Sequence, residues 1–167
     1  YVLSREFGLE LPKPMHPEVG ILVNEKADSE SRELAADEIY QTFKAEFLEK
    51  NDPLRLLSYE TQKIFGEADD VTCSVSIELD GEARQIEGQG NGPINAFVNA
   101  LENENLKDFK LTDYRQHSIG GGSATESAAF VQLQTKAGRV AYGCGIDSSI
   151  EKSGIMALVS AFNRTRS

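Results

Sequence analysis

The chain has 167 residues, and its 17 basic and 27 acidic side chains give a formal net charge of −10. A charge of this sign disfavours nucleic acids and anionic membranes as partners, and no window is apolar over the length that a membrane span requires. The length suits one ordinary domain, or a smaller domain with an appended arm.

The beginning of the chain indicates a piece of a longer polypeptide, because it opens with Tyr1 and carries no apolar leader. We expect no long helix past Leu9, since the segment 1–24 is interrupted by Pro12, Pro14 and Pro17. The polar residues 25–33 predict an exposed loop.

Residues 35–49 carry one apolar stripe at helical spacing, with Asp37 and Glu38 near the start, where a helix dipole favours negative charge. This pattern predicts an amphipathic helix. Pro53 ends the helical stretch, because the residue before a proline is pushed away from helical dihedrals. We therefore assign residues 1–52 to the remnant of a linker subdomain and this helix.

After Pro53 the apolar period changes to two. Residues 71–79 alternate apolar and polar side chains, which predicts a half-buried strand. Asp80-Gly81 is a strong hairpin signal and leads into a second strand towards Gly88. Residues 54–64 are a plausible strand on the N-terminal side. A helix follows the glycine-rich turn, with apolar residues at helical spacing: Ile94, Phe97, Val98 and Leu101.

The same order of elements returns in the second half, where residues 107–117, 127–135 and 139–146 predict strands and a helix runs to the C-terminus. Matched residues of the strands, such as Gly88 and Gly143, are 55 positions apart, and matched residues of the helices are 61 apart. Nine such matches argue for an internal duplication. We predict an α+β fold of two βββα repeats, 53–105 and 106–167, with each two-layer antiparallel sheet covered by its own helix and polar on the other face.

The turn from Gly88 to Pro93 brings three glycines to a helix N-terminus, a place that suits an anion. Its spacing is G-x-G-x-G, which is not the dinucleotide fingerprint, and no Gly-Lys-Ser/Thr follows as in a phosphate-binding P-loop. Its partner in the second repeat is Gly143-Cys144-Gly145.

The sequence contains few residues in patterns typical of a catalytic site. His16 lies among prolines and His117 at a strand end, and we read both as structural. Asp69-Asp70 suits a solvated turn and Asp147 a loop or helix cap. Cys73 and Cys144 match no metal spacing and favour two reduced, buried thiols in a cytoplasmic protein. With a flexible glycine-rich loop at 119–125, these features favour a small-molecule binding module over an active site.

Four segments carry a resemblance to a known family. They are Gly88 to Phe97, Asp113-Tyr114 with His117, Gly143 to Ile146, and Val159 to Arg164. From about Leu54 to the end, the chain resembles the C-terminal regulatory domain of α-isopropylmalate synthase, which condenses acetyl-CoA with 2-oxoisovalerate in leucine synthesis. The resemblance implies an acyltransferase parent whose metal-binding catalytic barrel lies elsewhere in the polypeptide, so this part of it holds no chemistry, no metal and no cofactor.

The resemblance also implies a homodimer that binds the end product L-leucine as an allosteric feedback inhibitor. Carried over by position, the effector contacts would be Gly90, Asn91, Gly92, Pro93, Ile94, Leu111, Tyr114, Ser118, Thr125, Ser127, Ile146 and Asp147. Backbone N–H groups would hold the carboxylate, and these segments also offer acceptors and an apolar wall. Serine or threonine at 118, 125 and 127, where relatives often have alanine, implies a more polar pocket.

Two alternatives stay open at this point. The chain could belong to a citramalate synthase and respond to isoleucine. It could also be a structural dimerisation module without an effector, in which case the glycines only make tight turns between strand and helix.

Overall fold

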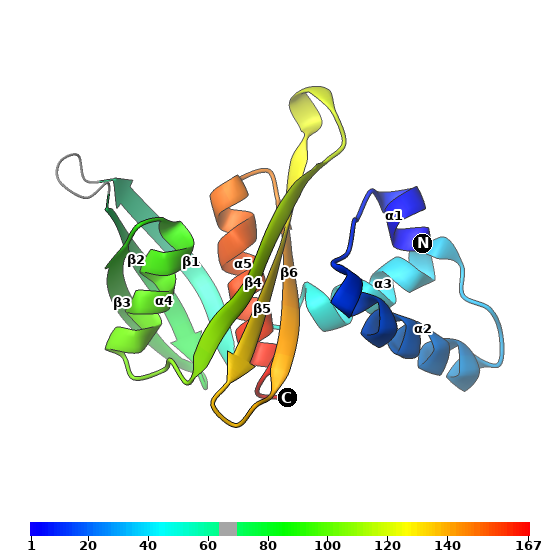
Figure 1. Ribbon diagram of the computed structural model, residues 1–167, viewed down its shortest axis with the longest axis horizontal. Helices are drawn as coiled ribbons and strands as arrows, with labels where there is room; N and C mark the ends of the chain where they lie inside the picture. Colours follow the sequence, from blue (N-terminus) through cyan, green and yellow to red (C-terminus); the bar gives the residue numbers. More distant parts are fainter. Residues whose placement is uncertain (64–69) are drawn as a thin grey trace.

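A computed structural model describes residues 1–63 and 70–167 of the protein (Figure 1). Four helical elements come first: α1 (Val2–Phe7), a short 3-10 turn (Lys13–Met15), α2 (His16–Glu30) and α3 (Ala36–Phe47). The first repeat contains β1 (Leu54–Lys63), β2 (Val71–Leu79), β3 (Glu82–Gly90) and α4 (Pro93–Asn103). The second contains β4 (Phe109–Ile119), a 3-10 turn (Gly122–Ala124), β5 (Glu126–Thr135), β6 (Val140–Asp147) and α5 (Ile150–Arg164).

The two repeats have the same topology. The first sheet is antiparallel with order β1-β2-β3 and the second with order β4-β5-β6, and each is followed by its helix, which confirms the predicted α+β class. An irregularity in β1 between Leu56 and Ser58 returns in β4 between Leu111 and Asp113, at the same spacing of 55 positions. Ile64, the predicted end of the first strand, and Asp69 of the predicted turn Asp69-Asp70 lie outside the described residues.

Paired glycines let each helix lie directly on its sheet. A Cβ on Gly88 would stand 2.2 Å from the backbone nitrogen of Ala100, and a Cβ on Gly143 would stand 2.2 Å from that of Ala161. Real Cβ atoms do not come this close, so glycine is required at both positions. These glycines therefore serve strand-to-helix packing within each repeat.

One apolar core joins the two repeats. It contains side chains of both sheets together with α4 and α5, among them Val75, Phe97, Val131, Leu158 and Phe162. Helix α5 covers β5 and β6 on one side and contacts β1 on the other, so it lies between the two sheets (Figure 1).

The second sheet is buried on both faces along β5 and β6, which corrects the expectation that each sheet has one polar face. Strand β5 is buried continuously from Ser127 to Val131. Its outward face packs through Phe130 on a second core that contains Phe43 and Phe47 of α3. Figure 1 shows α1, α2 and α3 on the side of this sheet opposite to α5. The uninterrupted apolar run from Ala128 to Val131 is typical of such a strand.

Two expectations for the N-terminal segment are wrong: no long helix past Leu9, and a loop at 25–33. Helix α2 runs from His16 to Glu30. Pro17 occupies the first helical turn, where its missing N–H costs nothing, and Ser31 ends the helix in the left-handed conformation. The predicted helix over 35–49 is confirmed as α3. None of the described helices is long and apolar enough to cross a membrane.

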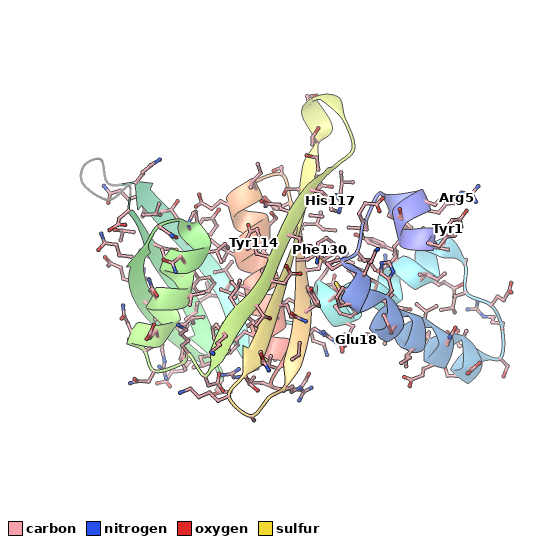
Figure 2. All side chains as sticks on the ribbon, viewed as in Figure 1. Tyr1, Arg5, Glu18, Tyr114, His117 and Phe130 are labelled. Atoms are coloured by element: carbon pink, nitrogen blue, oxygen red, sulfur yellow. The ribbon has the colours of Figure 1, made fainter. Side chains whose placement is uncertain are left out.

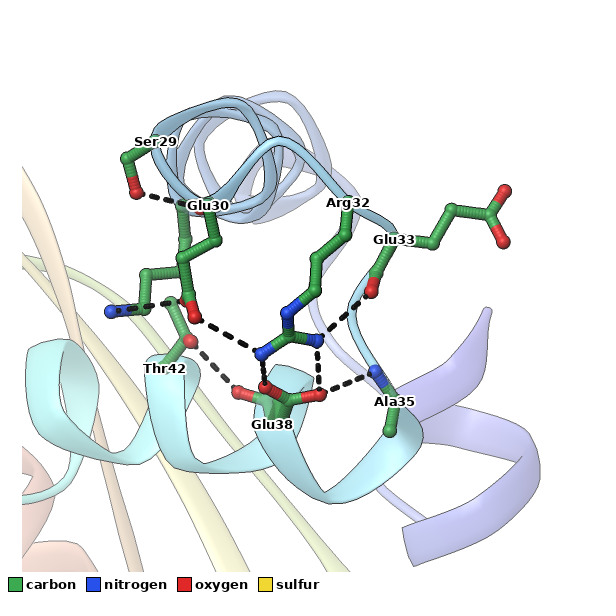
Figure 3. Close-up of polar contacts among 8 residues, drawn as sticks. Ser29, Glu30, Arg32, Glu33, Ala35, Glu38 and Thr42 are labelled. Carbon is green, nitrogen blue, oxygen red and sulfur yellow. Dashed lines mark hydrogen bonds and ion pairs between the residues drawn. The ribbon is translucent and has the colours of Figure 1, made fainter.

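The turn between α2 and α3 is closed by a polar cluster (Figure 3). Arg32 binds the carboxylates of Glu30 and Glu38, and Glu38 also accepts the backbone N–H of Ala35 at 3.0 Å. The hydrogen bond from Arg32, followed by that from Ala35, lowers the pKa of Glu38 to about 2. The ionised form of Glu38 therefore holds the start of α3.

Candidate functional site

The N-terminus of α4 is open. Gly92 precedes the helix without a side-chain cap, and its carbonyl accepts the N–H of Ala96 at 2.9 Å. Oδ1 of Asn95 accepts the N–H of Asn91 at 3.1 Å, and no hydrogen bond within the described residues takes up the N–H groups of Ile94 and Asn95. In α5, by contrast, Ser149 caps the helix and accepts the N–H of Lys152 at 3.2 Å. The N–H groups of Ile150 and Glu151 in α5 likewise have no acceptor among the described residues, but carboxylates of the chain, Asp147 and Glu151, already lie at that end. The first turn of α4 has no acidic residue, so its positive dipole end is free of carboxylates.

A pocket of about 630 Å³ lies at this helix end. It joins the first repeat to β4 of the second, and its lining residues are Asn91, Gly92, Pro93, Ile94, Asn95, Val98, Lys107, Lys110, Leu111 and Tyr114. Six of the twelve predicted contacts, Asn91 to Ile94 with Leu111 and Tyr114, thus share one cavity.

The lining of this pocket has an apolar and a cationic part. Ile94, Val98 and Leu111 offer aliphatic surface, while Lys107 and Lys110 offer positive charge, and no carboxylate is among the described residues that line the cavity. Tyr114 is 37% exposed, and burial raises the pKa of its hydroxyl, so it remains a neutral donor (Figure 2). This arrangement suits a small anion with an apolar tail.

A second group of predicted residues lies where β5 and β6 meet the start of α5. Ser118 pairs with Ser127 across β4 and β5, and Ser127 pairs with Asp147 across β5 and β6. Asp147 accepts the N–H of Ser149 at 2.9 Å and lies 3.4 Å from Nζ of Lys152. These polar groups already satisfy one another at the start of α5.

Gln116 connects the pocket to this second group. Its side-chain amide donates to Oγ of Ser153 at 3.1 Å and to the carbonyl of Ile150 at 2.8 Å, and its Oε1 lies 3.5 Å from the hydroxyl of Tyr114. Ser153 in turn donates to Oγ of Ser127 at 3.2 Å. The sequence analysis missed Gln116 and Ser153, although Gln116 shares the β4 face of Tyr114 and Ser118 by strand alternation.

Three predicted contacts lie away from the pocket. Gly90 packs against the backbone of α4, where a Cβ would stand 2.7 Å from the nitrogen of Ala96. Thr125 donates to the carbonyl of Gly122 at 2.8 Å in the glycine-rich loop. Ile146 packs into the core formed with the N-terminal helices, on the opposite face of the second sheet.

Both histidines contact backbone groups. His117 accepts the N–H of Glu10 at its Nε2, over 3.1 Å, and stacks on Phe130 with ring centroids 5.9 Å apart (Figure 2). Nε2 of His16 lies 3.1 Å from the carbonyl of Leu11. Within residues 1–63 and 70–167, no group of three or more His, Cys, Asp or Glu is placed to hold a metal ion.

Both cysteines are buried and free, as predicted. Burial raises the pKa of the Cys73 thiol to about 11, and it raises that of Cys144 further. Each thiol therefore stays protonated and acts as a small apolar side chain.

Residues 33–166 match the family described as the LeuA allosteric (dimerisation) domain. A 2-isopropylmalate synthase of Clostridium acetobutylicum is 36% identical over 169 residues, which cover 99% of this chain and 30% of the relative. The enzymes of the same name from Corynebacterium efficiens and Pseudomonas entomophila are each 33% identical, over 98% and 100% of the chain. The chain spans about 30% of the length of these curated relatives.

Proposed function

The chain belongs to the LeuA allosteric (dimerisation) domain family, and on this premise we propose that it regulates a 2-isopropylmalate synthase by binding L-leucine. In this proposal the two repeats, 53–105 and 106–167, form the regulatory domain of a cytoplasmic acyltransferase. The domain forms a homodimer, and the catalytic barrel of the same polypeptide responds to leucine as feedback inhibitor.

The observation that carries the proposal is the pocket between α4 and β4. The free N–H groups at the start of α4 and the ammonium groups of Lys110 and of Lys107, which also lies 3.5 Å from the carboxylate of Glu102, favour a carboxylate in an otherwise acidic chain. Ile94 and Leu111 provide an aliphatic wall for a branched side chain. A free branched-chain amino acid combines these two features in one small molecule.

The ammonium group of the amino acid requires acceptors. Among the residues that the structure describes, the pocket lining supplies only neutral ones, such as backbone carbonyls and the side-chain amide of Asn91. Asp147, which was predicted as a contact, lies at the start of α5 and lines no part of this cavity. We expect the ammonium to be held by neutral acceptors and water, with most selectivity coming from the carboxylate and the side chain.

The position of the pocket suggests how binding affects the rest of the enzyme. One wall comes from the first repeat and the other from the second, so a ligand that contacts both walls favours one relative placement of the repeats. If that placement belongs to the state of low activity, leucine shifts the population towards it. A coupling free energy of about 1–3 kcal/mol is typical of such regulation.

Calorimetric titration of the chain with L-leucine, L-isoleucine and L-valine tests the proposal. We expect saturable heat with leucine and weaker binding of the other two. A preference for isoleucine contradicts the assignment to leucine and favours the regulatory domain of a citramalate synthase. The absence of heat with all three contradicts effector binding and favours a structural dimerisation module.

A further inference from the structure

Helix α5 touches the pocket through a residue without a side chain. Gly154 lies in the first half of α5, and a Cβ added there would stand 2.7 Å from the hydroxyl oxygen of Tyr114 and 2.8 Å from Cδ1 of Ile94. Tyr114 and Ile94 line opposite walls of the pocket, one from each repeat. The ends of two pocket side chains therefore lie against the backbone of α5 at Gly154.

The other end of α5 holds the segment that joins α3 to β1. Oγ of Ser160 donates to the carbonyl of Phe47 at 2.5 Å. The side-chain amide of Asn163 donates to the carbonyls of Lys50 and Leu54, each at 2.7 Å, and its Oδ1 accepts the N–H of Leu54 at 2.9 Å. Asn163 is fully buried, so it clamps the chain where the first repeat begins.

Arg164 adds contacts between the end of α5 and helices α2 and α3. It is 7% exposed, donates to the carbonyl of Tyr142 at 2.7 Å, binds the carboxylate of Glu18 and lies 4.1 Å over the ring of Phe47. A buried guanidinium with these partners ties the end of α5 to the N-terminal helices.

Helix α5 is also fixed on its own sheet. Gly143 and Gly145 of β6 bring the strand so close that an added Cβ would stand 2.2 Å and 2.1 Å from backbone atoms of α5. The helix therefore moves together with the second sheet. Gly154 and Arg164 are about 15 Å apart along the axis at the usual helical rise, so a displacement at one end reaches the other end.

We propose that α5 transmits the state of the pocket to the N-terminal helices, with Gly154 as the positioning residue at the pocket and Asn163 as the clamp on the segment 47–54. The ligand follows from the proposed function above, but the contacts exist in the ligand-free chain. A change in how Ile94 and Tyr114 meet on Gly154 alters the placement of the first repeat against α5. The segment 47–54 joins that repeat to α3, so the hydrogen bonds that hold this segment on α5 change as well.

Hydrogen exchange measured by mass spectrometry on the whole chain tests this without any ligand. Gly154→Ala forces the ends of the Tyr114 and Ile94 side chains to move, whereas the control Gly20→Ala makes the same change inside α2, where the added Cβ would meet no atom within 4 Å beyond the adjoining backbone of its own helix. We expect exchange of the amides in 47–54 to change about threefold or more in Gly154→Ala and to stay unchanged in the control. Unchanged exchange there, or an equal change throughout the chain including β3, overturns the proposal.

A second pair of variants tests the opposite direction and covers the case in which Gly154→Ala does not fold. Ser160→Ala removes the bond to Phe47, and the control Thr165→Ala removes a bond within the last turn of the same helix, where Thr165 donates to Phe162 at 2.6 Å. We expect Ser160→Ala, but not the control, to change exchange at residues 91–95 of the pocket. No difference between the two variants overturns transmission through α5.

L-Leucine provides the last arm of the experiment. Binding heat together with changed exchange in 47–54 supports the inference. Binding heat without any change in 47–54 overturns it and leaves the proposed function intact. If no heat is measured, leucine binding fails as a function, and the comparison of Gly154→Ala with Gly20→Ala still decides whether α5 transmits.

Discussion

The substitution Gly92→Asp separates effector binding from folding. Gly92 has an extended backbone that any residue adopts, and an added Cβ would meet no atom within 4 Å. Aspartate is a favoured N-cap, and its carboxylate can accept the free N–H groups of Ile94 and Asn95. We therefore expect the variant to fold with a thermal midpoint equal to or above that of the wild type, because capping and the helix dipole add a few tenths to about 1 kcal/mol.

The same carboxylate lies where the carboxylate of leucine is expected. Two unit charges about 5 Å apart repel by about 1 kcal/mol in a water-like medium and by about 3 kcal/mol at an effective dielectric of 20. This range corresponds to a dissociation constant raised about 5- to 150-fold. Because the pocket is open to solvent, added salt should reduce the effect.

Gly92→Asn is the matched control, since asparagine caps the helix and has nearly the same size but carries no charge. Calorimetric titration of both variants at low and high salt, with thermal unfolding followed by circular dichroism, gives the comparison. Equal losses of affinity in the two variants would refute the electrostatic reasoning. Affinity unchanged in Gly92→Asp would place the effector site elsewhere.

Three further predictions concern stability. Gly143→Ala should lower the free energy of unfolding in urea by about 1–3 kcal/mol or more, because its Cβ would stand 2.2 Å from a backbone nitrogen of α5. The control Gly20→Ala should raise that free energy by up to about 1 kcal/mol. Equal changes in the two variants would contradict the packing argument. Arg164→Leu should cost about 2–4 kcal/mol through the lost bond to a β6 carbonyl and the lost ring contact, and a loss below about 1 kcal/mol would mean that the buried guanidinium holds nothing. Because Arg32 lowers the pKa of Glu38 to about 2, this contribution to stability is complete above the ordinary pKa of 4.5 and disappears as the pH falls towards 2; an NMR titration of Glu38 should have its midpoint near 2, and one near 4.5 contradicts the pairing.

The duplication and its strands were predictable because they depend on local constraints. Alternation along 71–79 and the hairpin at Asp80-Gly81 concern neighbouring residues, so both are visible in the sequence. Gly88 and Gly143 are conspicuous because no other residue allows strand and helix to approach so closely. The reason for glycine at these two positions was not predictable, since the sequence equally allows glycines that bind an anion.

The N-terminal helices were misjudged for a physical reason. Prolines were read as breaks, but Pro17 lies in the first turn of α2, where proline is favoured. Helix α2 is weakly amphipathic by sequence, and it buries Val19 against the core beneath the second sheet. Its stability therefore comes from tertiary packing, which a local pattern does not reveal.

The candidate site was predictable in part. Asn91 to Ile94 form one contiguous turn, so their position follows from the start of α4. The contributions of Gln116 and Gly154 depend on how the second repeat lies against the first, which no spacing within either repeat specifies. A glycine inside α5 was nevertheless a signal, because it costs about 1 kcal/mol relative to alanine and needs a packing reason.

The two repeats place equivalent turns at the starts of α4 and α5, yet the turns have diverged. At α5, Ser149 accepts one backbone N–H, and Asp147 accepts the N–H of Ser149 and pairs with Lys152, so a carboxylate of the chain already lies at this helix end. At α4, Gly92 leaves its donors free and the lysines of the second repeat stand beside them. Duplication alone would give two similar anion sites in each chain. Because carboxylates of the chain already lie at one turn, the other is the place where the carboxylate of an effector gains most from binding to backbone donors and lysines.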